Sequence, residues 1–371
     1  MRLILPLASV AIAALLGACS PAETTDSSGC QLGVLPSQYD SPDYDSNTAV
    51  ERDVRTRFKA FLRPMRDAEA NLSIKPSESD LRALFEAGTP SLRTLTSDYY
   101  RPKADALITA FAAAAGSTWA PMSPPSGAGG KYGAYIFSAD GTDLRQAIEK
   151  GLFAAAFYRH GLSLMASPSS TATVDRLIAS FGAHASFPAD TAAAQNPDEF
   201  AAAYAKRRDK RDPQSPGVYL GFKSAAIQAR AAIAAGESCI AQRDEALRSL
   251  RGHWERALLA TSIYYFNDAG KKIGAAAPTM ADMAAGLHSY GEAVGFIHGF
   301  RSLPADSRII TDAQIDDLLT LVGAPSSGAV TSYRLVTDPA AELPKLSLAI
   351  TRIAAIYGFT PAQVEDFKTN Y

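Results

Sequence analysis

Two side chains four residues apart are the first candidates for chemistry in this chain. They are His288 and Glu292, within the segment 286–292. Positions i and i+4 share one face of a helix, so an imidazole and a carboxylate at this spacing can bind one metal ion. The same two groups can act as a general acid and base. The structural alternative is a histidine hydrogen-bonded to a carboxylate on a polar helix face.

A second candidate pair comes from two segments that are similar in sequence. Residues 144–154 align with residues 250–260, and the alignment places Glu149 opposite Glu255. The similarity suggests two related helical bundles. In that case the two carboxylates would occupy equivalent places and could meet as a site for a divalent metal or iron, or as an acid/base site. The alternative is that each carboxylate forms a structural ion pair with a cation of the other segment, because buried carboxylates are usually paired.

The residue types therefore give a set of candidate metal ligands but no catalytic residue. The candidates are His288, Glu292, Glu255, Glu149 and His253. The chain has no His-Glu-x-x-His zinc motif, no Gly-x-Ser-x-Gly nucleophile elbow and no paired Glu-x-x-His segments of a di-iron protein. These absences favour binding over catalysis.

The helix expected to carry His288 contains a glycine stripe. Gly291, Gly295 and Gly299 recur every four residues. Each glycine in a helix interior costs about 1 kcal/mol relative to alanine, so three on one face call for a compensating contact. We expect a neighbouring helix to approach closely along this stripe, which would place His288 and Glu292 in a crowded space between helices.

The fold class follows from apolar residues at helical spacing through most of the chain after Val50. Long helices are predicted after Thr142 and over 240–265. Three later helices have clear start signals, which are Thr279 with Asp282, Thr311 with Gln314 and Thr360 with Gln363. The only run with strand character is 132–137. The prediction is an all-α protein, a helical bundle or two related bundles packed as an internal duplication.

Composition sets limits on the partners. Lys and Arg number 36 against 38 Asp and Glu, so the chain lacks the cationic excess of a nucleic-acid-binding protein. Cationic side chains do gather at 206–211, but Asp209 interrupts them and Asp212-Pro213 follows. We interpret this run as a solvated loop.

The first residues indicate where the protein is located. Arg2 precedes a short apolar run, and Leu16-Gly17-Ala18-Cys19 resembles the lipobox of bacterial lipoproteins. In that class, residues 1–18 are removed as a signal peptide and Cys19 becomes the lipidated first residue, which anchors the protein to a membrane. Ser20 favours the outer membrane, facing the periplasm or the cell surface. An ordinary cleaved signal peptide is the alternative.

Composition also divides the remainder of the chain. Residues 19–46 are rich in Ser, Asp, Thr and Pro and are predicted to form a flexible tether. Residues 47–371 are the predicted helical domain, with possible halves at about 47–235 and 236–371. Cys30 and Cys239 remain after Cys19 is assigned to lipid. In an oxidising compartment they would either form a disulfide that pins the tether to the domain or stay as two thiols.

Several motifs together resemble an uncharacterised bacterial lipoprotein family, the domain of unknown function 4856. They are the lipobox, Lys150-Gly151-Leu152, His253-Trp254-Glu255 and His288-Ser289-Tyr290-Gly291-Glu292. A more distant resemblance is to imelysin-like proteins, which are exported, helical, built from two related bundles and associated with iron uptake. Their Gly-x-His-x-x-Glu motif corresponds to Gly286-x-His288-x-x-x-Glu292 here, with one extra residue.

These observations lead to three functional hypotheses. The first is an envelope lipoprotein that binds a metal ion or a metal-bearing ligand in iron acquisition, as the His288/Glu292 pair and the imelysin-like resemblance imply. The second is a non-enzymatic adaptor that docks an envelope protein partner. The third, a metallopeptidase, is implied only by the grouping of imelysin-like proteins with peptidases.

Overall fold

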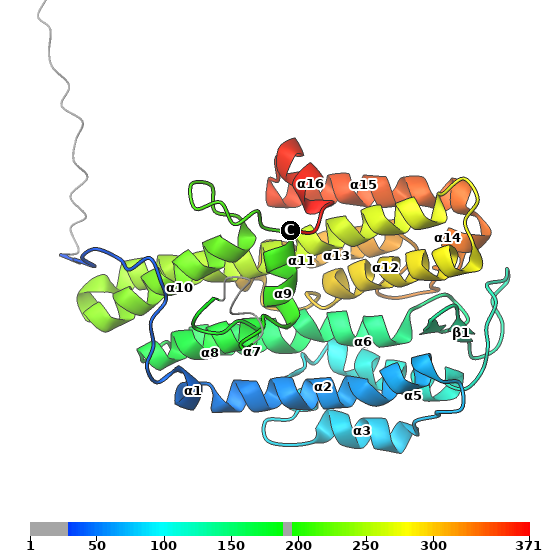
Figure 1. Cartoon of the computed structure of the whole chain (residues 1–371), viewed down its shortest axis with the longest axis horizontal. Helices are drawn as coiled ribbons and strands as arrows, with labels where there is room; N and C mark the ends of the chain where they lie inside the picture. The colour runs from blue at the N-terminus through cyan, green and yellow to red at the C-terminus, as the bar shows by residue number, and fades with distance from the viewer. Residues whose placement is uncertain (1–28, 188–194) are drawn as a thin grey trace, which may run out of the picture.

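A computed structural model describes residues 29–187 and 195–371 and shows a predominantly helical protein (Figure 1). The expected signal peptide, residues 1–18, and the expected lipidation site, Cys19, lie outside the described residues. Within the described ranges the only sheet is one two-stranded hairpin. The all-α prediction is confirmed.

The elements are described here in chain order. The first group of helices is α1 (Tyr44–Asn47), α2 (Ala49–Ala70), α3 (Glu78–Glu86), α4 (Leu92–Leu95), α5 (Tyr100–Ala114), α6 (Leu144–Leu152), the π-helix η1 (Phe153–Tyr158), α7 (Arg159–Met165), α8 (Thr171–Phe181), α9 (Phe200–Arg207) and α10 (Val218–Ala235). The second group is η3 (Glu237–Cys239), α11 (Ile240–Ile273), α12 (Met280–His298), η4 (Ala305–Ser307), α13 (Asp312–Leu321), α14 (Arg334–Thr337), α15 (Pro339–Tyr357) and α16 (Pro361–Phe367). The hairpin is β1 (Gly130–Tyr132) and β2 (Tyr135–Phe137), which lie between α5 and α6.

The long helices are stacked in layers (Figure 1). Helix α2 packs against α3 and α8, and α5 packs against α3 and α6. Helix α12 lies at the centre of the stack, with α6 on one side and α11 on the other. Helix α11 also contacts α9, α10, α15 and α16. The buried apolar residues form one cluster that includes members from α2 to α16, so the core is continuous across the expected division into halves.

The predicted helix starts are mostly confirmed. Thr279, Thr311 and Thr360 each cap a helix in a reciprocal capping box with the residue three positions later. Helix α6 is different, because its cap is Asp143 rather than Thr142, and the Asp143 side chain accepts from the Gln146 backbone N–H at 2.9 Å. The strand-like run 132–137 is folded back on itself as a hairpin.

A glycine seam brings α12 against α6, as the sequence predicts. A β-carbon at Gly291 would lie 2.7 Å from the Asp143 side chain, and one at Gly295 would lie 2.7 Å from the Lys150 side chain. A β-carbon at Gly299 would lie 2.2 Å from a backbone oxygen of α6. Real β-carbon contacts are essentially never this short, so only glycine permits this approach. The seam therefore sets the distance between the polar side chains of the two helices.

The expected internal duplication is not established by the structure. The two similar segments lie in α6 and at the middle of α11. Helix α6 passes into the π-helix η1 after Leu152, whereas α11 continues as one α-helix to Ile273. The two segments thus differ in backbone geometry from Phe153 onward, which is within the aligned stretch 144–154.

The N-terminal tether is shorter than predicted. Tyr39 and Tyr44 are buried, and both α1 and the start of α2 pack into the helical body. The fully buried Asp175 accepts hydrogen bonds from Tyr39, Ser41 and Asn47 at 2.6 to 2.8 Å. The boundary expected at residue 46 is therefore too late, because apolar and hydrogen-bonding side chains before it belong to the domain.

Cys30 and Cys239 form a disulfide, with their Cα atoms 4.8 Å apart. The bond connects the N-terminal segment to η3, at the start of the long helix α11. Of the two arrangements left open by the sequence, the structure has the bridged one.

Within residues 29–187 and 195–371, no helix is both long enough and apolar enough to cross a membrane.

Candidate functional site

A polar cavity of about 270 Å³ lies where α9, α11, α12 and the C-terminal residues meet. Its walls contain three tyrosines, three cationic and two acidic side chains, a histidine and several neutral polar groups. The lining residues are Tyr204, Arg207, Arg208, Thr261, Tyr264, Tyr265, Asp268, Lys272, His288, Ser289, Glu292 and Asn370. Two of the five predicted ligands, His288 and Glu292, are among them. We call this space the polar cavity.

His288 is fixed by two neighbours. Its Nδ1 lies 2.7 Å from Asp143 Oδ2, and its ring stacks on Tyr135 with 3.8 Å between centroids. A carboxylate accepts a hydrogen bond only from a protonated Nδ1, so in the neutral imidazole this contact leaves the lone pair on Nε2. A carboxylate that orients the far nitrogen of a histidine is the usual support of a metal-binding imidazole. Asp143 thus presents Nε2 for binding.

Glu292 lies directly beside that nitrogen. Its Oε1 is 3.5 Å from His288 Nε2 and 3.7 Å from the ammonium of Lys150. Its other oxygen, Oε2, is buried and has no hydrogen-bond partner among the described residues. A buried carboxylate oxygen without a partner is costly, which makes Oε2 a natural ligand position for a cation or a donor.

Lys150 connects this pair to a layer of buried charges under the cavity. The ammonium lies 2.7 Å from Glu149 Oε1 and 2.7 Å from the Tyr204 hydroxyl. Burial disfavours the charged form of Lys150, but Glu149 and Glu292 outweigh burial and raise its pKa. Burial opposes ionisation of Glu149 as well, but Lys150 and Arg145 lower its pKa to about 2. Both side chains are therefore charged at neutral pH.

Arg145 completes the charge layer. Its guanidinium lies 2.6 Å from Glu69 and 2.8 Å from Glu149. Burial raises the pKa of Glu69, and Arg145 only partly offsets this effect. Glu149 is satisfied by Lys150 and Arg145 and is therefore a structural partner of both, whereas Glu69 Oε1 is buried without a hydrogen-bond partner among the described residues.

The remaining predicted ligands lie elsewhere. Glu255 is fully buried and accepts hydrogen bonds from the backbone N–H groups of Ile309 and Ile310 and from the Tyr357 hydroxyl, all at 2.7 to 2.9 Å. Glu255 thereby fixes the backbone turn after η4, which is a structural role. His253 lines a different cavity of about 470 Å³ and packs against Gly221. The structure therefore does not bring Glu149 and Glu255 together, and neither residue shares a partner with His288.

Two site residues were missed by sequence reasoning because their partners are remote. Asp143 is 145 residues from His288 in the chain. Arg208 was expected in a solvated loop, but it is only 3% exposed and lies in the cavity wall. The glycine stripe signals that a helix approaches α12 closely, but it does not identify that helix or Asp143. No local signal marks Arg208 as buried.

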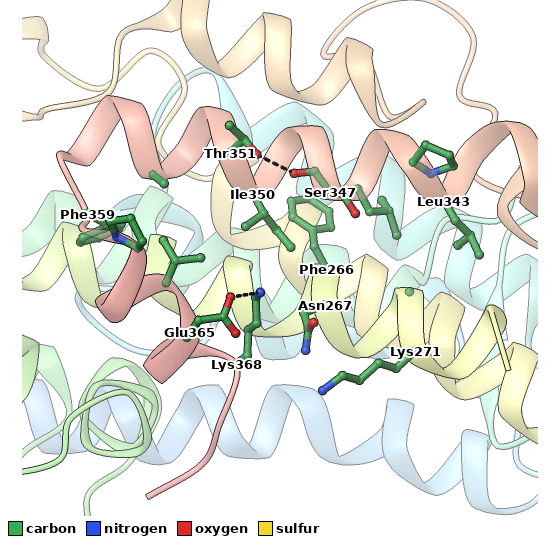
Figure 2. A pocket seen from close by; sticks show the side chains of 16 residues that line it. Phe266, Asn267, Lys271, Leu343, Ser347, Ile350, Thr351, Phe359, Glu365 and Lys368 are labelled. Carbon is green, nitrogen blue, oxygen red and sulfur yellow. Dashed lines mark hydrogen bonds and ion pairs between the residues drawn. The ribbon is translucent and has the colours of Figure 1, made fainter.

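A larger hollow lies on the other side of α11, between that helix, α15 and α16 (Figure 2). We call it the apolar groove; its volume is about 810 Å³. It is lined by Phe266, Asn267, Gly270, Lys271, Leu343, Pro344, Leu346, Ser347, Ile350, Thr351, Ala354, Phe359, Pro361, Val364, Glu365 and Lys368. Two pairs of polar groups in the groove bond to each other, as Figure 2 shows. Thr351 donates to the Ser347 carbonyl at 3.1 Å, and Lys368 donates to Glu365 at 2.5 Å.

The described residues of the polar cavity supply too few protein ligands to hold a bare metal ion by side chains alone. Among the described residues, no three His, Cys, Asp or Glu side chains are grouped so that they could hold a metal ion. The cavity offers two candidate ligand atoms, His288 Nε2 and Glu292 Oε2. The other ligands of a metal bound there would come from its own chelator or from water.

Comparisons with protein-family models, with curated proteins and with solved structures found no match to this chain.

Proposed function

We propose that this chain is an envelope-anchored lipoprotein that captures a small metal-bearing ligand in the polar cavity, with iron as the metal. The observation that carries the proposal is the convergence of His288 Nε2 and the unpartnered Glu292 Oε2 on one cavity. Anchoring rests on the lipobox-like residues that end at Cys19. A cavity of about 270 Å³ lies just below the usual range of about 300 to 1,000 Å³ for small-molecule sites, which suits only a compact chelate.

The arrangement of charges supports capture of a chelate over a bare ion. Lys150, 3.7 Å from Glu292, would repel an unshielded cation that approached Oε1. A chelate reduces that repulsion because its anionic donors neutralise the metal. His288 and Glu292 would then supply the two protein ligands, and Asp143 would hold the imidazole in its binding orientation.

The test is calorimetric titration of ferric citrate into the purified protein and two variants. We expect binding to the wild type and a loss of affinity of at least about tenfold in His288→Ala, because one of two protein ligands is removed. The matched control is His184→Ala, which removes an imidazole that hydrogen-bonds Ser186 outside the polar cavity. Equal affinity in wild type and His288→Ala would overturn the proposal.

A second candidate function, docking of an envelope protein partner, is favoured by the apolar groove. Ile350 and Val364 are partly exposed there among other apolar side chains. If a partner docks in this groove, Ile350→Glu will abolish its binding and leave ferric citrate affinity unchanged. Retained partner binding in Ile350→Glu would exclude the groove as the docking site.

A further inference from the structure

A buried guanidinium without a counter-ion lies in the wall of the polar cavity. Arg208 is 3% exposed, and among the described residues it forms no ion pair. Its Nη1 donates to the Phe367 carbonyl at 2.5 Å, and its Nη2 donates to the Asn370 side-chain oxygen. Its Nε is buried and has no partner in the described part of the chain. The cation is thus held only by neutral groups.

Two other deeply buried arginines show how unusual this arrangement is in the molecule. Arg145 pairs with Glu69 and Glu149, and Arg308 pairs with Asp312 at 2.8 Å. Burial by itself would lower the pKa of Arg145, but the surrounding carboxylates outweigh this effect and raise it. Arg208 has no such carboxylates in the described part of the chain, and burial lowers its pKa to about 10. Arginines are rarely fully buried without a partner, because an unpaired charge loses its hydration without compensation.

The surroundings of Arg208 add to its positive charge. Its guanidinium lies 4.1 Å from the centre of the Tyr264 ring, which lines the same cavity. Arg207 is adjacent in the wall, and it too has no carboxylate partner among the described residues. The other wall cation, Lys272, is already paired with Asp268 at 2.6 Å. The unneutralised charge of the cavity is therefore concentrated at the two arginines.

We propose that Arg208 is the anion-binding residue of the polar cavity and that the captured ligand carries an oxyanion, a carboxylate or phosphate group, which pairs with its guanidinium. The planar donor fork of arginine matches the geometry of both groups. The Asn370 amide oxygen accepts from the same guanidinium, so it marks a position that the oxyanion would take. For the choice of cavity, this inference rests on the proposed function.

The ligand would then have two recognised ends. Its oxyanion would pair with Arg208, supported by Arg207, and its metal would meet His288 and Glu292 in the same cavity. A metal chelated by a polycarboxylate or a phosphate-bearing molecule has both features. A neutral chelate would leave Arg208 without a counter-ion and is not expected to bind well.

The test uses metal-free anions, so that it is independent of the metal. Citrate and inorganic phosphate are titrated separately into the wild type, Arg208→Met and Arg208→Lys. We expect at least one anion to bind, with affinity at least about tenfold weaker in Arg208→Met and an intermediate value in Arg208→Lys, which keeps the charge but not the planar fork. Citrate alone would indicate a carboxylate ligand, and phosphate alone a phosphate ligand.

The control is Arg159→Met, which removes an arginine that donates to the Leu95 carbonyl outside the cavity. Its anion affinity should match the wild type within about twofold. The melting temperature of ligand-free Arg208→Met should be equal to or above that of the wild type, because an unpaired buried charge is lost. Failure of both anions to bind the wild type, or equal binding by Arg208→Met, would overturn the inference, even if ferric citrate still binds through His288. If the metal-free anions bind as expected but ferric citrate does not bind, the proposed function is refuted and the inference about Arg208 stands.

Discussion

The polar cavity and the apolar groove lie on different sides of α11, and they differ in what their side chains leave unsatisfied. The groove is three times larger, but its polar groups are exposed or bonded to each other. The cavity is small, yet Glu292 Oε2 and Arg208 Nε are both buried without hydrogen-bond partners in the described part of the chain. The proposed ligand site is therefore chosen by these two unsatisfied groups in one cavity and not by volume.

The largest expected effect comes from removing the central cation under the cavity. Lys150 is 1% exposed and lies between Glu149 and Glu292. We expect Lys150→Met to lower the free energy of unfolding by about 3 to 5 kcal/mol, because it leaves buried carboxylates uncompensated. Lys368→Met, which breaks the exposed pair with Glu365 at the groove, should cost less than about 1 kcal/mol. Urea unfolding measures the free energy of unfolding of both variants. Equal losses in the two variants would contradict the difference drawn between the polar cavity and the apolar groove.

Acid should destabilise the charge layer under the cavity. The pKa of Glu149 is about 2 in the folded protein against an ordinary value of 4.5, so its ionised form stabilises the fold above pH 4.5. That stabilisation, about 3 kcal/mol, is lost as the pH falls from 4.5 to 2. Urea unfolding between pH 5 and pH 2.5 should show most of the loss. Glu69, whose pKa is raised, alters the stability only above its ordinary pKa of 4.5 and in the opposite direction, so it does not account for a loss below that pH.

The matched control for this acid effect lies in the groove. Glu365 is largely exposed, and its removal in Glu365→Gln should leave the pH dependence as in the wild type. A wild-type free energy of unfolding that stays constant from pH 5 to pH 2.5 would show that Glu149 is not stabilised by its buried cations.

Replacing a glycine by alanine should have opposite effects on stability at the α6–α12 seam beside the polar cavity and in the wall of the apolar groove. Gly295→Ala should lower the free energy of unfolding by about 1 to 3 kcal/mol, because its β-carbon would lie 2.7 Å from Lys150 and 2.9 Å from the Gln146 carbonyl. Gly270→Ala, in the groove wall, meets no atom within 4 Å and should raise it by up to about 1 kcal/mol through helix propensity. Thermal unfolding of the two variants tests this. A stabilised Gly295→Ala would refute the tight seam.

The smallest effect concerns the orientation of His288. Asp143→Asn keeps an oxygen to cap α6, since Asn caps helices as well as Asp does, but it removes the charge that fixes Nδ1–H. We expect ferric citrate affinity to fall by about tenfold with little loss of stability. Calorimetry and thermal unfolding together separate the two results. Unchanged affinity would show that Asp143 does not position the imidazole.

Local patterns made much of the fold predictable from sequence. The caps at Thr279 and Thr311 depend only on a residue three positions later, and the helical periodicity needs no distant partner. The glycine stripe predicted close packing of α12 correctly because the cost of glycine in a helix is a local property. The run 132–137 was predicted to have strand character, but its turn at Gly133 divides it between two strands, and β1 begins earlier, at Gly130.

The site was only partly predictable, because its partners are distant in the chain. The spacing of His288 and Glu292 shows that they share a face, but not that Asp143 and Lys150 lie opposite them. The alignment that suggested a pairing of Glu149 with Glu255 reflects similar helices whose carboxylates have different partners. Arg208 belongs to a charged run, and its burial depends on Asn370, 162 residues away. Tertiary packing decides these contacts.

The most direct test of the central claim is a crystal structure of the protein grown with ferric citrate, with anomalous diffraction data collected at the iron absorption edge. We expect one iron peak in the polar cavity within bonding distance of His288 Nε2 and Glu292 Oε2, with a citrate carboxylate against Arg208. An iron peak elsewhere, or citrate bound in the apolar groove, would contradict it.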